Sequence, residues 1–436
     1  MPIRELIFVL VGISLTCVAP FKPRIGLYGY IWISVAQPDV IAWCIHKYPF
    51  SMLLAAGTLI GCLRYVGSVG VLFRIPMVWI LLLMQIPLAL SVIFSPETFL
   101  SMDRYETYLR VMIMALAIPL LMESVQHMKE LMLTLVITEA FLGSRQGLFG
   151  LIQGGAVLNQ VYGDGIYDNN VLALSIATLI PICWYFYTML PPKKTRLLVL
   201  IIIVTAVPAV IMTGSRGASL AFGAILFCMI FYSKRRTAFL VLVMLALGPA
   251  IYLMKDVYFS RMQTIAHYQD EASASSRVEF WQAAIEMWQD YPLLGVGFGQ
   301  RNFSAMVPKY TGKNDRHVVH NTYLQMLVDS GIFAFLLYCL LLIVTIVWLG
   351  KSIRETRWSG SGVEAIPMAL QVAIIGMTLG STFYSLQLFD YLYMLLMTGA
   401  AWYRVSKFGE LATAGSNEGE ESGEIFEADL QVEAQS

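Results

Sequence analysis

The stretch GIFAFLLYCLLLIVTIVWLG, residues 331–350, decides the fold class. It contains no Asp, Glu, Lys or Arg, and as an α-helix it is long enough to cross about 30 Å of hydrocarbon. Backbone N–H and C=O groups find no water inside a bilayer, so a segment of this kind must pair them internally, as a helix does. The stretch therefore predicts a transmembrane helix.

The rest of the chain repeats this pattern. Its residues are 58% hydrophobic and 13% charged, with a mean hydropathy of +0.67, whereas soluble domains have about 25% charged residues. We predict an all-α, polytopic integral membrane protein with about 12–13 spans, the lower number applying if the short early blocks merge or re-enter. The apolar blocks lie near 5–21, 25–43, 50–63, 76–95, 107–122, 131–149, 171–189, 197–213, 216–232, 238–254, 322–349, 365–384 and 388–403.

Basic residues in the short connections predict the orientation, because cytoplasmic loops of membrane proteins are enriched in Lys and Arg. Such residues gather near 193–196, 234–236, 351–357 and 404–407. If these clusters are cytoplasmic, the segments 150–170, 213–216 and 255–321 face outward, and with 13 spans the amino terminus does too.

We predict three regions along the chain. Residues 1–190 form an N-terminal transmembrane region, and residues 191–408 form a second membrane domain that includes the large outward loop 255–321. Residues 409–436 form a tail that is rich in Glu and has no Lys or Arg. Such a composition predicts a disordered segment on the cytoplasmic side.

The outward loop 255–321 is too long and too aromatic to be a simple connection. Ser276 and Glu279 have the spacing of a capping box, and aromatic residues then recur on one helical face up to Pro292. We therefore expect an amphipathic helix near 276–291. The glycines of GVGFG, 295–299, predict a tight turn and not a nucleotide loop, because no strand or lysine accompanies them.

The short connection TGSRGA, 213–218, places an arginine at the start of a span. Ser215 is a candidate N-cap and Arg216 lies in the first turn. A helix N-terminus and a guanidinium together form a good phosphate site. The alternative is an arginine that reaches to lipid headgroups.

A second candidate is HVVHNTYL, 317–324, where the large loop returns to the membrane. His320 lies at or just before the helix start, where the helix dipole disfavours imidazolium, and neutral imidazole can act as a general base. The alternative is an interfacial or capping histidine. Arg277 opens the amphipathic helix, and the alternative to a functional role is a surface ion pair with Glu279 or a neighbour.

Several motifs are absent from the sequence. There is no acidic pair in the early outward segment 44–49, no HExxH motif, no nucleotide-binding loop and no cysteine spacing for a metal. We therefore expect no metal ion, no cofactor and no nucleic-acid partner.

Three blocks of sequence resemble the membrane domain shared by O-antigen ligases and O-antigen polymerases. These blocks are SRGASLAF, SRVEFWQAAIEMWQDYPLLGVGFGQRNF and HNTYLQMLVDSGIFAF, and their order and separation match that domain over about 205–350. The amino-terminal half more loosely resembles the O-glycosylation ligases that accompany exosortase A systems.

The resemblance implies glycan transfer at the periplasmic face of a bacterial inner membrane. The donor would be a glycan on polyprenyl diphosphate, and the acceptor a hydroxyl of a lipid, sugar or protein. By motif, Arg216 and Arg277 would bind the diphosphate and His320 would be catalytic. Polar residues expected to support them are Ser215, Asn321, Tyr323 and Arg301. Asp329 stands where the family often has Glu, and we expect it to pack or to hydrogen-bond.

This chemistry suits the residues. A hydroxyl that attacks the anomeric carbon needs a base, and arginines stabilise a leaving diphosphate without a metal. Three alternatives remain: a polymerase that uses the same donor, a permease that moves a glycolipid or solute without chemistry, and a non-enzymatic assembly component.

Overall fold

The computed structural model describes residues 2–38, 47–152, 169–189, 194–232, 235–266, 272–313, 317–356 and 362–409. Within these ranges all regular structure is helical. The acidic tail beyond residue 409 and most of the predicted outward segment 150–170 lie outside the described residues. The helices are α1 (Ile3–Val18), α2 (Pro23–Ala36), α4 (Phe50–Cys62), the 3-10 helix η1 (Leu63–Ser68), α5 (Val69–Leu72), α6 (Pro76–Ile93), α7 (Thr98–Leu121), α8 (Val125–Ile152), α9 (Asn169–Met189), α10 (Lys194–Met212), α11 (Arg216–Tyr232), α12 (Arg236–Ala266), α13 (Ala272–Asp290), α14 (Arg301–Thr311), α15 (Thr322–Thr356), α16 (Ala365–Gly380) and α17 (Asp390–Phe408).

The prediction of an all-α, multi-pass membrane protein is confirmed. In the part of the chain that the structure describes, six helical segments are long and apolar enough to cross a bilayer, and three shorter apolar helices accompany them. The figure of 12–13 spans stays a prediction. The six long segments are Phe50–Leu72, Pro76–Ile93, Val125–Ile152, Asn170–Met189, Arg236–Leu253 and Thr322–Thr356.

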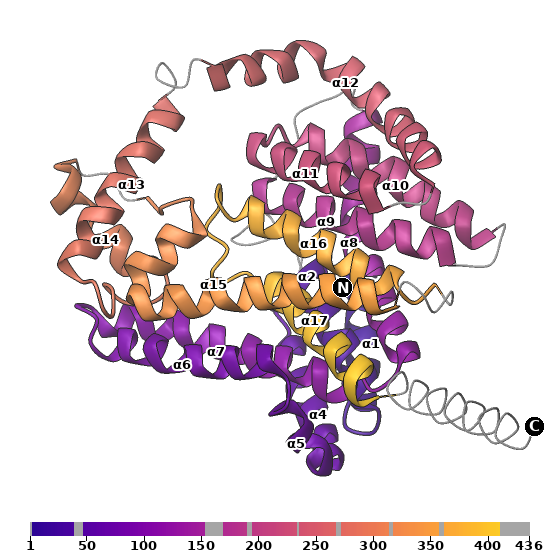
Figure 1. Cartoon of the computed structure of the whole chain (residues 1–436), viewed down its shortest axis with the longest axis horizontal. Coiled ribbons are helices and arrows are strands. Elements are labelled where there is room, and N and C mark those ends of the chain that lie inside the picture. Colours follow the sequence, from indigo (N-terminus) through magenta and orange to yellow (C-terminus); the bar gives the residue numbers. More distant parts are fainter. Residues whose placement is uncertain are drawn as a thin grey trace, which may run out of the picture.

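Helix α17 lies at the centre of the packing. Every residue from 391 to 402 is buried, and α17 contacts helices that include α7, α15 and α16. In Figure 1, α15 runs alongside the α6–α7 pair, while α8, α9, α10 and α11 form a second group. Near the other end of α17, Arg404 is buried and donates to the carbonyls of Pro119 (2.9 Å) and Leu120, and it pairs with Glu123 at 3.0 Å. These contacts satisfy carbonyls at the end of α7, which would otherwise have no partner.

Helix α15 is broken near its start, which the apolar block 322–349 did not predict. Gly331 has φ 75 and ψ −178, so residues 322–330 form a separate first segment. The large loop satisfies the backbone groups that the break exposes. Ile332 donates its N–H to the Pro292 carbonyl at 3.0 Å, and Gly297 donates to the Asp329 carbonyl at 2.9 Å.

The large loop contains more helix than predicted. Helix α12 continues to Ala266, and α14 was not anticipated. The amphipathic helix is present as α13, but it begins at Ala272, so the predicted capping box at Ser276 is wrong. Glu279 instead accepts an ion pair from Lys313 at 2.6 Å. An apolar cluster from α13, α14 and the following segment holds the loop together, with Phe280, Met287, Phe303, Val307 and Val319 among its members.

Candidate functional site

The first part of the site is the start of α11. Ser215 is its N-cap, as predicted: its Oγ accepts the Ala218 N–H at 3.4 Å, and its carbonyl accepts the Ser219 N–H at 3.0 Å. Gly214 has φ 66 and turns the chain into the helix. Arg216 is the first helical residue and is half-buried. The positive end of the helix dipole and a guanidinium therefore lie together.

The second part is the segment that leads into α15. Asn321 caps this helix, because its Oδ1 accepts the N–H groups of Tyr323 at 3.0 Å and Leu324 at 3.2 Å. His320 directly precedes this cap and has a φ of 52, a left-handed conformation that is uncommon for residues other than glycine. The prediction that His320 lies just before the helix start is confirmed. Its side chain is half-buried.

The connection between α16 and α17, residues 381–389, joins the two parts. The Tyr384 hydroxyl lies 2.6 Å from Ser215 Oγ, and Ser385 Oγ accepts the His320 N–H at 3.1 Å. Tyr384 and Ser385 are adjacent in the chain, and their Cα atoms are about 3.8 Å apart. The connection therefore contacts both the α11 start and the histidine segment through neighbouring residues. Thr322 fixes the same connection, because its Oγ1 donates to the Tyr384 carbonyl at 2.6 Å.

Sequence reasoning missed this connection. Residues 381–387, STFYSLQ, were assigned to the end of one apolar block and the gap before the next. The available signal was their polar content between two apolar blocks, but nothing local indicated which segments they would contact.

Helix α13 packs against the histidine segment. Trp281 Nε1 donates to the Val319 carbonyl at 2.9 Å, and the rings of Phe280 and His317 lie 5.1 Å apart. Arg277 is one turn before Trp281 and so lies on the same face of α13. Glu279 pairs with Lys313 at 2.6 Å.

Two residues that were expected to support the site, Tyr323 and Arg301, instead contact neighbouring helices. The Tyr323 hydroxyl donates to the Thr378 carbonyl in α16 at 2.7 Å, which fixes α15 against α16. Arg301 pairs with Asp103 at 2.7 Å on the exposed surface, which links the start of α14 to α7. Both contacts position helices around the site.

Asp329 is fully buried at the break in α15 and links three segments. Its carboxylate accepts the Gln300 N–H at 2.8 Å, Gln387 Nε2 at 2.6 Å and Gln325 Nε2 at 2.8 Å. Gln325 Oε1 in turn accepts the Val319 N–H at 3.0 Å. The expectation that Asp329 is a hydrogen-bonding position is confirmed, and it ties the large loop to the connection 381–389.

The predicted tight turn at 295–299 packs against Asp329. Gly295, Gly297 and Gly299 all have positive φ values. A Cβ at Gly295 would collide with the Asp329 backbone, so the close approach requires glycine. The segment is thus a packed turn, as predicted.

Other features of the large loop are structural. The Tyr310 hydroxyl donates to Asp290 at 2.6 Å and joins α14 to α13. Burial, and then the nearby Asp290 carboxylate, raise the pKa of the Tyr310 phenol. Among the described residues, no group of three or more His, Cys, Asp or Glu side chains has the arrangement of a metal site.

The chain is therefore an all-helical, multi-pass membrane protein with a polar site at the starts of two helices. Residues 201–339 match the O-antigen ligase family, and residues 3–190 match a family of unknown function (DUF5935). The first match contains both helix starts and α13, and it ends before the connection 381–389. It implies an enzyme of the glycosyltransferase type. No curated protein matches the chain.

Proposed function

We propose that this protein is a glycan ligase. It transfers an oligosaccharide or polysaccharide from polyprenyl diphosphate to a hydroxyl acceptor on the periplasmic face of a bacterial inner membrane. The observation that carries the proposal is the pair of contacts from Tyr384 to Ser215 and from Ser385 to His320. Two neighbouring residues thus contact the start of α11, a candidate anion site, and the segment that contains the candidate base. The O-antigen ligase match over 201–339 supports the same chemistry.

The donor diphosphate binds at the start of α11. The helix N-terminus supplies a positive dipole end and backbone N–H groups that point outward along the helix axis, and Arg216 supplies a planar guanidinium. Arg277 approaches from α13, on the face that contacts the histidine segment through Trp281. Two arginines stabilise the negative charge that develops on the leaving diphosphate.

His320 acts as the general base. The acceptor O–H gives its proton to the imidazole as its oxygen attacks the anomeric carbon. The new C–O bond forms while the bond from carbon to the diphosphate oxygen breaks, and the electron pair leaves with the diphosphate. The proton is later released from the imidazolium to solvent or product. The step requires no oxidant and no other reactant.

The test uses a host strain that lacks this protein and is complemented at matched membrane levels with wild type, His320→Ala or His317→Phe. His317→Phe is a matched control, because it replaces an exposed histidine three residues earlier and keeps an aromatic ring against Phe280. We expect His320→Ala to accumulate the lipid-linked glycan and to form no conjugate, while His317→Phe resembles wild type. Conjugation at the wild-type rate in His320→Ala would remove the histidine from the mechanism.

The acceptor separates a ligase from a polymerase. A polymerase would add the donor glycan to a second lipid-linked repeat, so its product would stay on polyprenyl diphosphate. A permease would form no new linkage in any variant. Analysing the lipid that carries the product in the wild-type strain therefore distinguishes the three functions.

A further inference from the structure

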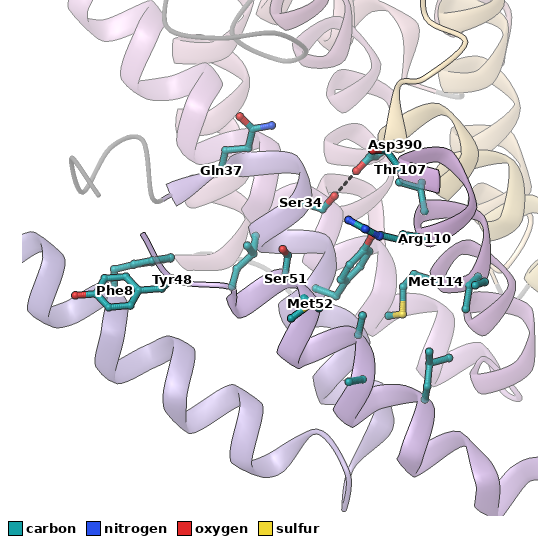
Figure 2. A pocket seen from close by; sticks show the side chains of 17 residues that line it. Phe8, Ser34, Gln37, Tyr48, Ser51, Met52, Thr107, Arg110, Met114 and Asp390 are labelled. Atoms are coloured by element: carbon teal, nitrogen blue, oxygen red, sulfur yellow. Dashed lines mark hydrogen bonds between the residues drawn. The ribbon is translucent and has the colours of Figure 1, made fainter. Parts of the chain in front are cut away.

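A cavity of about 610 Å³ lies mainly in the amino-terminal half, and its lining includes no residue of the histidine segment. Helices α1, α2, α4 and α7 surround it, and Asp390, the first residue of α17, closes one end. Figure 2 shows this arrangement. Its volume lies within the range of small-molecule sites, about 300–1,000 Å³.

The rim of the cavity faces the bilayer. Met52 is 61% exposed and Leu59 is 37% exposed, and both belong to the candidate span Phe50–Leu72. Ile113 of α7 is 48% exposed on the other side. Exposed apolar side chains on a membrane span contact lipid, so the cavity opens to hydrocarbon. Its occupant is therefore a membrane component with an apolar chain.

One end of the cavity is polar. Ser34 Oγ donates to the Asp390 carboxylate, and Thr107 and Arg110 approach from α7, as Figure 2 shows. Arg110 also pairs with Glu106 on the exposed surface of α7. This end of the cavity therefore has one guanidinium, that of Arg110, and two carboxylates nearby, those of Glu106 and Asp390. Such an end repels a diphosphate, which carries several negative charges, and it favours a neutral head with hydroxyl groups, because carboxylates accept hydrogen bonds from hydroxyls.

The polar end is close to the candidate site along the chain. Asp390 follows Ser385 by five residues, a distance of at most about 17 Å for an extended chain. Asp103, which pairs with Arg301 of the large loop, lies about 10 Å along α7 from Arg110. A head group made of a few sugars spans such a distance.

We propose that this cavity binds the acceptor, a membrane lipid with a neutral, hydroxyl-bearing head such as a glycolipid. The chain lies against α4 and α7, and the head binds at Asp390, Ser34 and Arg110. The role as acceptor rests on the proposed function, whereas lipid binding itself does not. Under the proposed function, donor and acceptor then bind at separate places: the diphosphate at the α11 start and the acceptor head at the polar end of the cavity.

The test is photolabelling of the full-length protein in phosphatidylcholine nanodiscs. The probe is a long-chain alkyl glycoside with a photoreactive group in its chain, and its twin has the same chain with a phosphocholine head. We expect the glycoside to label peptides of α4 and α7 more strongly than the twin. Ala55→Trp fills the cavity from its wall and should abolish this labelling, while Ile60→Trp, on the lipid-facing surface of the same helix, should not.

A second variant tests the head. Asp390→Asn weakens one hydrogen bond to a charged group, and we expect about a tenfold loss of glycoside labelling with no change for the twin. Size-exclusion profiles establish that each variant is folded. Equal labelling by both probes, or undiminished labelling of Ala55→Trp, would overturn the inference.

The two proposals fail separately. Labelling is repeated in His320→Ala, which retains the cavity and cannot transfer glycan if the proposed function is correct. Loss of the acceptor site predicts a higher apparent KM for acceptor with little change for donor in Ala55→Trp. Labelling of His320→Ala at the wild-type level is therefore the expected result. Labelling of a wild-type protein that forms no conjugate would sustain the lipid site and remove only its role as acceptor.

Discussion

Replacement of Asp329 by Ala should release the large loop from the membrane domain. The carboxylate is fully buried and accepts hydrogen bonds from the Gln300 N–H and from the side chains of Gln325 and Gln387. Alanine leaves these three donors without their partner. A buried donor without a partner costs about 1–3 kcal/mol, so the sum is about 3–9 kcal/mol before water or rearrangement reduces it. This is a large fraction of the stability of a typical protein, about 5–15 kcal/mol.

The assay combines thermal unfolding in detergent with limited proteolysis of the purified protein. We expect Asp329→Ala to unfold at a lower temperature. We also expect faster cleavage within 292–313, the part of the large loop that Asp329 binds through the Gln300 N–H. Glu355→Ala is the control, because Glu355 is a partly exposed acid that pairs with Lys351 and Lys407. Such surface pairs contribute about 0–1 kcal/mol, so its behaviour should match wild type.

The reasoning is refuted if Asp329→Ala and Glu355→Ala are equally stable and equally resistant to protease. In that case water or a rearranged glutamine replaces the carboxylate without cost. Asp329→Asn refines the test, because it retains one acceptor oxygen and should fall between alanine and wild type.

The remaining predictions concern the connection 381–389 and the break in α15. Ser385→Ala should lower the conjugation rate by up to about tenfold through the lost bond to the His320 N–H, and Ser385→Thr should restore most of it, as measured by product formed at saturating donor. Tyr384→Phe removes the hydroxyl next to Ser215 and should raise the apparent KM for donor more than it lowers kcat. Gly331→Ala places a side chain at φ 75, where it would also meet a backbone carbonyl, and should reduce the amount of folded protein in membranes on immunoblots.

The helices were predictable because the bilayer leaves the chain few choices. An apolar segment in lipid must satisfy its own backbone, so composition alone indicates a helix. The starts of α11 and α15 were predictable for a local reason. Ser215 and Asn321 cap these helices through N–H groups within three residues, and such contacts depend on neighbouring sequence only.

The features that sequence reasoning missed depend on contacts between distant residues. The start of α13 lies four residues before the predicted capping box, and Glu279 binds Lys313, which follows the end of α14, instead. The break at Gly331 requires the carbonyl of Pro292 as acceptor, and Asp329 joins Gln300 to Gln387. No local pattern of residues 322–349 records these partners, so the block is read as one continuous span.

The conformation of His320 connects these observations to function. A left-handed residue with a side chain costs about 1–2 kcal/mol, and such outliers persist only where the surroundings determine them. Here the Ser385 hydroxyl holds the His320 N–H, and Asn321 caps the helix that follows. Neither contact is needed simply to connect a loop to a helix, since an extended residue before the cap serves equally well. The surroundings therefore fix the backbone of this histidine relative to Ser385 and its neighbour Tyr384, which contacts the α11 start. A fixed position of this kind is what the proposed role of His320 as a base requires.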